Sequence, residues 1–401
     1  MEAKEKVIVL GRNYTSRLGM IRAAGLAGYE VIVINTERGE KAKNHVYDQH
    51  SKYVADYHYA AEPHEEELLS ALLGKCAADS VKNILLPTDD YTAAVIDKHQ
   101  RELEEKFLFP HAWHEPNAIV GFMNKEVQKE YALKAGLNVP KGWTARFTNG
   151  SFEVPEDITF PCFVKAEISF QGSKFYMKKC ATKEELEAHL GTVAKDLLKK
   201  KKQTDLLIEE FYEIEREFAI LGFSDGERVL VPDVLEANFM HLGVTAQGTI
   251  MSIDMFPGLR SQLERYVAEY HFCGLFDIDL FESKGKIYFC EMNFRFGASG
   301  YAVTHAGVNL PELLIDTLLG KEVDFSKVPE VPKKTFANEK VCCQEYVDKT
   351  MDWKATVNSI REVDFTFVEN AEDPGPGKAF WKWARNYRMK RLIKGLLPGK
   401  G

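Results

Sequence analysis

The segment 286–297, which reads KIYFCEMNFRFG, joins a short apolar run to three polar side chains at alternate positions. The apolar run predicts a buried strand. Successive side chains point to opposite faces of a strand, so Glu291, Asn293 and Arg295 are expected on one face. Carboxylate and amide oxygens are ligands that Mg²⁺ prefers, usually together with substrate phosphates, and an arginine beside them suits a phosphoryl group or a carboxylate. Taken alone, a solvated strand end explains the pattern equally well.

A second pair of acidic residues lies just upstream, in the run GLFDIDLF at 274–281. The polar turn ESKG that follows predicts a hairpin, which brings Asp277 and Asp279 near Glu291 and Asn293. Carboxylates that converge on one patch repel each other unless a cation lies between them. We therefore predict Asp279, Glu291 and Asn293 as metal ligands. Asp277 replaces Asp279 if the turn has a different register.

Length and composition describe an ordinary globular protein. The 401 residues are 45% hydrophobic and 28% charged, which predicts two or three subdomains with a large core. The net charge of −8 argues against a nucleic-acid partner. We expect neither a leader segment nor a membrane span, because no apolar run reaches about 18 to 20 residues.

The cysteines carry a separate prediction. Seven are present without C-x-x-C spacing, which indicates free thiols in a reducing compartment and hence a cytoplasmic protein. The neighbouring Cys342 and Cys343 are interpreted as structural residues on a strand.

The N-terminal part has the pattern of a parallel crossover unit. A strand at 7–10, a helix at 15–27 and a strand at 31–34 follow one another at the required spacing. No G-x-G-x-x-G follows the first strand, and Asn35 stands where an acidic ribose ligand is expected. We therefore predict an open α/β layer that does not bind a nicotinamide dinucleotide.

A further strand at 83–86 ends at a polar segment of the same layer. Loops at the carboxyl ends of parallel strands usually hold ligands. Arg12, Asn13, Thr88 and Asp89 are therefore candidate substrate contacts. Capping of the next helix explains Thr88 and Asp89 at least as well.

Two lysines stand at positions that suit phosphate binding. Lys125 lies on a helix predicted from Asn117 to Gly136, and Lys165 ends the apolar strand 160–164. The small-residue loop 167–174, EISFQGSK, follows immediately. An ammonium group neutralises phosphate charge, and loop amides and hydroxyls bind phosphate oxygens. The loop is not a Walker motif, because G-x-x-x-x-G-K-[ST] is missing.

The segment 206–220, LLIEEFYEIEREFAI, reads as two strands joined by a short acidic hinge. The backbone of such a hinge, next to an apolar slot, can pair with the edge of a purine. Glu217 can accept hydrogen bonds from ribose hydroxyls. An ordinary charged turn is consistent with the same sequence.

The segment DPGPG at 373–377 predicts a break in the chain. The tail after it has eight basic residues and no acidic one, with Phe380, Trp381, Trp383 and Tyr387 interleaved. Such a tail can lie on an anionic membrane surface. It can equally pack its aromatic rings on the protein and expose the basic groups.

The order of these elements resembles the ATP-grasp superfamily from about Asn117 to Leu319, and the preceding layer is similar to that family's usual N-terminal domain. The resemblance implies an open parallel α/β sheet followed by an α+β ATP-grasp fold with a small C-terminal extension. The expected divisions are 1–116, 117–328 with a mobile subdomain at about 142–212, and 329–401.

The resemblance also implies a role for each candidate residue. The departure from the family is Phe294, where many members have proline between the asparagine and the arginine. The implied cofactors are ATP and two Mg²⁺ ions, for which Mn²⁺ can substitute. The implied contacts are Lys125 and Lys165 with phosphates, Gln171, Gly172 and Ser173 in a loop over them, Glu210, Phe211 and Glu213 at the adenine hinge, Glu217 at the ribose, Asp279, Glu291 and Asn293 at the metals, and Arg295 with Lys165 at the reacting phosphoryl group.

The implied activity is ATP-dependent ligation of a small carboxylate to an amine, or to a thiol, through an acyl phosphate with release of ADP and phosphate. Segments 10–20 and 97–138 look most similar to the D-aspartate-ligase-like carboxylate–amine ligases. A bicarbonate-activating enzyme like carbamoyl phosphate synthase or biotin carboxylase is the first alternative. A catalytically silent nucleotide-binding protein is the second. The resemblance is compatible with a homodimer.

Overall fold

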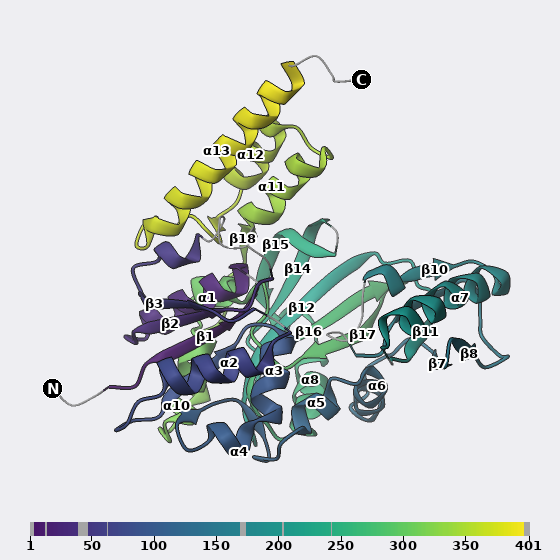
Figure 1. Ribbon diagram of the computed structural model, residues 1–401, viewed down its shortest axis with the longest axis horizontal. Helices are drawn as coiled ribbons and strands as arrows, with labels where there is room; N and C mark the ends of the chain where they lie inside the picture. Colours follow the sequence, from purple (N-terminus) through teal and green to yellow (C-terminus); the bar gives the residue numbers. More distant parts are fainter. Residues whose placement is uncertain are drawn as a thin grey trace.

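Three β-sheets organise the chain, and a group of helices projects from them (Figure 1). The computed structural model describes residues 4–12, 14–38, 47–61, 63–168, 174–202, 204–241 and 243–396.

The first sheet has the strand order β3-β2-β1-β4-β5, and every pairing in it is parallel. Its central strands are buried along their whole length, as expected for a parallel sheet covered on both faces. The predicted crossover unit is therefore present. The elements of this layer are β1 (Val7–Gly11), α1 (Tyr14–Leu26), β2 (Val31–Asn35), β3 (Val54–Tyr59), α2 (Glu65–Ala71), β4 (Asn83–Pro87), α3 (Asp90–Lys98), α4 (Gln100–Leu103) and β5 (Phe107–Leu108).

The second sheet has the order β10-β9-β11-β7-β8, and its pairings are antiparallel. Helix α7 (Lys183–Lys200) covers it with a buried stripe that includes Leu186, Leu190 and Leu197. The strands are β7 (Gly142–Thr148), β8 (Ser151–Glu153), β9 (Cys162–Ala166), β10 (Lys178–Cys180) and β11 (Leu206–Glu210).

The third sheet is the largest and contains the predicted hairpin. Its main path is β17-β16-β12-β14-β15-β18-β19, while β13 pairs with β12 and β6 pairs with β16. The strands are β6 (His111–Ala112), β12 (Arg216–Asp225), β13 (Val229–Leu230), β14 (Asp233–His241), β15 (Val244–Ser252), β16 (Phe272–Ser283), β17 (Lys286–Asn293), β18 (Lys334–Ala337) and β19 (Phe365–Thr366).

Helices pack on both faces of this third sheet. Ile220 and Ile278 face one core with residues of α5 (Ala118–Phe122), α6 (Lys125–Lys134) and α8 (Leu259–Ala268). Leu221 and Leu275 face a second core with residues of α1, α9 (Gly300–His305) and α10 (Leu310–Leu318). The alternation of strand side chains produces these two cores.

The prediction of one helix from Asn117 to Gly136 is wrong, because the segment forms α5 and α6 with a break between them. Asn124 is extended, and its side-chain oxygen accepts a hydrogen bond of 2.8 Å from the backbone N–H of Glu126. An asparagine in this role starts a new helix. Lys125 is therefore the first residue of α6.

The placement of Cys342 and Cys343 on a strand is also wrong. Both are buried in α11 (Glu339–Asp348), which Asn338 caps by accepting from the N–H of Val341. All seven cysteines are free thiols, as predicted.

The DPGPG segment begins a helix instead of ending one, which corrects the predicted break. Helix α13 (Pro374–Leu396) starts at its first proline, and proline is tolerated in the first turn of a helix. A Cβ on Gly375 would lie 2.0 Å from the carbonyl oxygen of His50, so this contact requires glycine. Helix α13 packs beside α11 and α12 (Trp353–Arg361) in the group that projects from the body (Figure 1).

The aromatic rings of this tail turn toward the protein. Phe380 is 1% exposed, and its ring centroid lies 5.6 Å from that of Tyr47. Trp381 and Trp383 pack against the same core, while Lys378 and Lys382 are exposed. This arrangement matches the second of the two interpretations of the tail. In the described part of the chain, no helix has the length and apolar character needed to cross a lipid bilayer.

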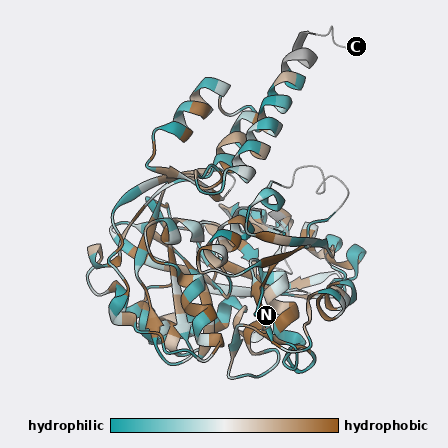
Figure 2. Cartoon of the chain, turned by 90° about the vertical axis from the view of Figure 1, so that its left-hand side faces the viewer, coloured by the Kyte–Doolittle hydropathy of each residue, from teal (hydrophilic) through white to brown (hydrophobic). Residues whose placement is uncertain are grey.

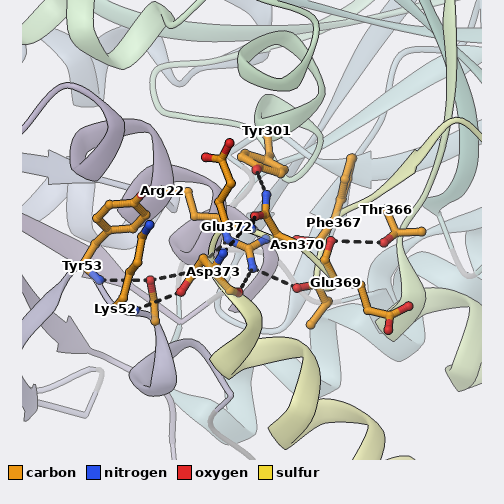
Figure 3. A network of polar contacts seen from close by, with 12 residues as sticks. Arg22, Lys52, Tyr53, Tyr301, Thr366, Phe367, Glu369, Asn370, Glu372 and Asp373 are labelled. Carbon is orange, nitrogen blue, oxygen red and sulfur yellow. Dashed lines mark hydrogen bonds and ion pairs between the residues drawn. The ribbon is translucent and has the colours of Figure 1, made fainter.

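A buried ion pair connects α1 to the start of α13. Arg22 Nε lies 2.9 Å from Asp373 Oδ2, and the two side chains are 1% and 2% exposed. The guanidinium also donates to the carbonyl oxygens of Phe367 and Val368. Figure 3 shows this network converging on Arg22 from the segment that precedes α13.

We expect Asp373→Ala to lower the free energy of unfolding by about 3–5 kcal/mol, because it leaves the Arg22 guanidinium buried without its carboxylate. Urea denaturation followed by circular dichroism measures the change. Glu372→Ala is the matched control, since its side chain is exposed beside Asp373. Equal stability of both variants would show that the pair does not hold the two helices together.

Candidate active site

The β16–β17 hairpin brings the predicted acidic residues together. Asp279 pairs with Glu291 and Asp277 pairs with Asn293. The register shifts next to Asp279, where Cys290 is an extra residue in β17. Residues directly opposite in antiparallel strands share a face, so all four side chains lie on one face of the sheet.

Both predicted lysines reach carboxylates at this face. Lys125 Nζ lies 2.7 Å from Glu291 Oε2. Lys165 Nζ lies 2.8 Å from Glu209 Oε2, and Lys129 Nζ lies 2.5 Å from the other oxygen of Glu209. The result is a row of alternating charges that links α6, β9, β11 and β17.

Glu209 and Lys129 were not predicted, although the sequence contains a signal for each. Lys129 lies four residues after Lys125 and therefore on the same side of α6. Lys165 pairs with Leu207, and Glu209 lies two positions further along β11, on the same face. The pairing of β11 with β9, which completes the signal for Glu209, is visible only in the structure.

Arg295 lies just beyond β17 and is held by two carboxylates. Its Nη1 lies 2.8 Å from Asp277 Oδ2, and its Nε lies 3.2 Å from Asp90 Oδ1. Asp90 begins α3 in the first layer and was not predicted. A Cβ on Gly297 would lie 2.3 Å from Asp277 Oδ2, so only glycine permits this close approach. The arginine joins the hairpin to the first layer.

The other predicted residues of the first layer act as structural contacts. Asp89 caps α3 by accepting from the N–H of Thr92 at 2.8 Å, and it also accepts from the N–H of Arg12 at 2.7 Å. The hydroxyl of Thr88 donates to the carbonyl oxygen of Leu10. Asp89 therefore caps α3, as one of the two interpretations predicted. Asn13 lies outside the described residues.

The carboxyl groups of this site differ in how readily they are protonated. Burial alone would raise the pKa of Glu291, but Lys125 and Lys165 outweigh burial and lower that pKa to about 2. Burial raises the pKa of Asp279 well above its usual value, and repulsion from Asp277 and Glu291 raises it further. One carboxyl of the adjacent pair is therefore strongly ionised, while the other favours its protonated form.

A further buried carboxyl, Asp233, begins β14. It is fully buried, and neither of its oxygens has a hydrogen-bond partner among the described residues. Burial and the charge of Asp277 raise its pKa well above the usual value. No sequence pattern identified this residue.

Phe294 points away from the acidic face. It is buried, and its ring lies edge-on to Tyr270 and Phe272, each at a centroid distance of 5.2 Å. The side-chain alternation therefore continues through Phe294 despite the missing proline.

The predicted adenine hinge lies between β11 and β12. Glu210 accepts a hydrogen bond of 3.2 Å from the Tyr212 hydroxyl. Lys179 reaches this segment from β10: its Nζ lies 3.6 Å from the centroid of the Phe211 ring and 3.4 Å from Glu213 Oε1. The hinge is thus in contact with the second sheet.

Glu217 lies on β12, two residues before Ala219, which pairs with Asp279. Its side chain therefore shares the acidic face. Burial raises the pKa of Glu217. The predicted loop residues Gln171, Gly172 and Ser173 lie outside the described residues.

The candidate metal ligands are two carboxylates and one amide oxygen, which are hard donors of the kind that Mg²⁺ accepts. Asn293 Nδ2 lies 3.5 Å from Asp279 Oδ2, and Asp277 Oδ1 is buried without a hydrogen-bond partner among the described residues. Across the described ranges, no three His, Cys, Asp or Glu side chains are arranged to hold a metal. The donor chemistry fits Mg²⁺ if substrate oxygens complete the coordination.

No protein-family model matches the chain. The C-terminal section of the carbamoyl phosphate synthase large chain from Aquifex aeolicus is 22% identical over 268 residues, which are 65% of this chain and 48% of that protein. The large chain from Clostridium beijerinckii is 25% identical over 227 residues, covering 52% of this chain and 20% of that protein. The chain thus spans half or less of the length of the curated relatives it matches.

Solved structures cover most of the chain at low identity. An L-amino acid ligase from Bacillus licheniformis is 15% identical with a TM-score of 0.59, covering 84% of this chain and 80% of that one. An ADP complex of N5-carboxyaminoimidazole synthetase from Staphylococcus aureus is 16% identical with a TM-score of 0.61, covering 84% and 83%.

A biotin carboxylase domain of 2-oxoglutarate carboxylase from Hydrogenobacter thermophilus, in complex with MgADP and bicarbonate, is 18% identical with a TM-score of 0.63, covering 83% of this chain and 74% of that one. Each of these similarities covers more than 80% of this chain. The chain therefore has the fold of the ATP-grasp superfamily, as the order of its motifs predicts.

Proposed function

We propose that this chain is an ATP-dependent ligase that joins a carboxylate to an amine, or to a thiol, with release of ADP and phosphate. The observation that carries the proposal is the hairpin that sets Asp279 opposite Glu291, with Arg295 and two lysines around them. The site brings cations and hard oxygen donors together, which is what phosphoryl transfer requires.

ATP would lie between the second and third sheets. Lys165 on β9 and Lys125 on α6 would hold phosphate oxygens, which would replace the carboxylates of Glu209 and Glu291 as their partners. The hinge residues Glu210, Phe211 and Glu213 would border the adenine, and Glu217 the ribose. Gln171, Gly172 and Ser173 stay predictions for the loop over the phosphates. Complexes of the structural neighbours with ADP support nucleotide binding.

Asp279, Glu291 and Asn293 would hold Mg²⁺, which neutralises phosphate charge when bound. We also propose that two ions bind and that Mn²⁺ can replace Mg²⁺. Asp279 is favoured over Asp277 as the ligand, because Asp277 is engaged by Arg295 at 2.8 Å. Lys125 keeps Glu291 ionised, so that this carboxylate is ready to bind a cation.

The chemistry would proceed by two displacements. A substrate carboxylate oxygen attacks the γ-phosphorus, the bond from that phosphorus to the β–γ bridging oxygen breaks, and ADP leaves with the electron pair. The amine then attacks the acyl carbon, phosphate leaves, and the nitrogen loses a proton. Arg295, held by Asp90 and Asp277, would face the charge of the transferred phosphoryl group. No side-chain nucleophile is needed.

Bicarbonate activation is the second candidate, and the carbamoyl phosphate synthase relatives together with the biotin carboxylase neighbour support it. In that case ADP formation depends on bicarbonate. The L-amino acid ligase neighbour supports an amino-acid substrate. The narrower likeness to D-aspartate-ligase-like enzymes stays a prediction. ATP binding without ADP production under any substrate pair would indicate a silent nucleotide-binding protein.

We also propose the divisions 1–116, 117–328 and 329–401, with 142–212 as a mobile subdomain. The separate five-stranded sheets and their cores support the first two units. Strands β18 and β19 of the third unit extend the central sheet. A homodimer stays a prediction, as does membrane contact of the tail, which the inward packing of the tail's aromatic rings disfavours.

Glu291→Gln and Arg295→Met should each lower ADP formation by about 100-fold or more, because they remove a metal ligand and the cation that faces the phosphoryl group. A phosphate-release screen that pairs amino acids and other carboxylates with amines, with and without bicarbonate, identifies the substrates first. Glu269→Gln is the control, since Glu269 is exposed on α8's C-terminal side. Near-normal turnover of both site variants, with thermal unfolding unchanged, would contradict the proposal.

Lys125→Met should raise the pKa of Glu291, because Lys125 is the strongest of the groups that lower it. The wild-type pKa, about 2, lies below the ordinary value of 4.5, so the charge pair stabilises the fold above pH 4.5 and loses this effect as the pH falls toward 2. Carboxyl ¹³C shifts of Glu-labelled protein, assigned with Glu291→Gln, report the titration over roughly pH 3 to 6. Lys134→Met, at an exposed lysine of α6, should leave it unchanged.

A further inference from the structure

A second concave site lies far along the chain from the acidic hairpin, between α12 and α13. It is a pocket of about 740 Å³ that is open to solvent. The helical group that contains it projects from the body of the protein (Figure 2). None of the described residues proposed to bind ATP or metal lines it. The side chains that matter for its chemistry are Trp353, Arg361, Lys378, Trp381, Arg385 and Arg388.

The pocket is positively charged in a protein of net charge −8. Four of its lining residues are cations, and Glu369 is the one carboxylate among them. All four cations are exposed, and the described tail from 378 to 391 has no acidic residue. A concave surface lined by one sign of charge concentrates small ions of the opposite sign. The occupant that this charge favours is an anion.

Two indole rings form the apolar part of the pocket. The centroids of Trp353 and Trp381 lie 6.4 Å apart, with the rings at 88°. The Arg388 guanidinium lies 5.2 Å from the centroid of Trp353, and Arg385 Nε donates to the Trp381 carbonyl oxygen at 3.2 Å. The Trp353 indole therefore has a cation beside it, and Arg385 lines the same pocket, an arrangement that suits a flat ring carrying a negative group.

The indole N–H of Trp381 is a further polar feature of this region. Its Nε1 is buried and has no hydrogen-bond acceptor among the described residues, although buried indole N–H groups usually find one. The same side chain lines the pocket. An oxygen of a bound ligand is an acceptor of the kind this donor lacks.

We propose that the pocket between α12 and α13 binds a small aromatic carboxylate or phosphate, separately from the ATP site. The ring packs against the two indoles, and the anionic group lies against Arg385 and Arg388. A lipid surface is disfavoured as the occupant, because the aromatic rings face a concave pocket and the protein core instead of extending outward.

Isothermal titration calorimetry of the full chain with 2-naphthoate tests the proposal, with uncharged 2-naphthamide as the matched ligand. We expect 2-naphthoate to bind about fivefold more tightly or better, because the amide lacks the charge. The double variant Arg385→Gln, Arg388→Gln should weaken 2-naphthoate by about fivefold or more. Equal binding of acid and amide, or no binding of either, would overturn the proposal.

The control variant is Lys382→Gln, Lys390→Gln, which removes the same charge from exposed positions of α13 outside the pocket. It should change the affinity less than about twofold. An equal loss in both double variants would mean that only the general charge of the helix matters, and this would overturn the site. Thermal unfolding of each variant confirms that the fold is retained.

Two further titrations separate other sources of binding. Binding of 2-naphthoate should persist at a saturating concentration of a nonhydrolysable ATP analogue, and displacement by the analogue would assign it to the nucleotide cleft and overturn the proposal. Phosphatidylglycerol vesicles should bind no more tightly to the wild type than to Arg385→Gln, Arg388→Gln. Binding of vesicles through these arginines, in place of 2-naphthoate, would overturn it as well.

Discussion

The adjacent carboxylates of Asp279 and Glu291 are the constraint on which the rest of the site depends. Two partly buried carboxyl groups on neighbouring strands repel each other when both are charged, and the hairpin fixes them side by side. The fold compensates by bringing Lys125 from α6 and Arg295 from the loop after β17 to the same face. Lys125 and Lys165 keep Glu291 ionised, while burial and repulsion incline Asp279 to hold its proton. A divalent cation placed between them would remove this imbalance.

The alternating polar residues were enough to predict the hairpin and its shared face, and the resemblance of the motif order to ATP-grasp proteins implied the fold. The first two features are local, since strand alternation alone places Glu291 and Asn293 on one face. Asp90, Glu209 and Asp233 could not be predicted, because each joins the site through tertiary pairing of an element distant in sequence. A carboxylate beside a lysine can be recognised only when the pairing of their strands is known.

The errors in secondary structure have local causes. Asn124 was read as part of one continuous helix, although its side chain starts a second one. The DPGPG segment was read as a break, although proline in a first turn is compatible with a helix start. Asparagine and proline can each stand where a helix ends or where a helix begins. Tertiary contacts, such as the approach of Gly375 to His50, decide between the two outcomes.

The Arg22–Asp373 pair has a consequence for biosynthesis. Arg22 belongs to α1, while its carboxylate partner is synthesised 351 residues later. Until then the guanidinium has neither Asp373 nor the carbonyl groups of Phe367 and Val368 to bind, and its burial would be costly. The first layer therefore cannot reach its final packing until Asp373 has been made. The last step in the packing of α1 thus depends on a segment that is translated long after it.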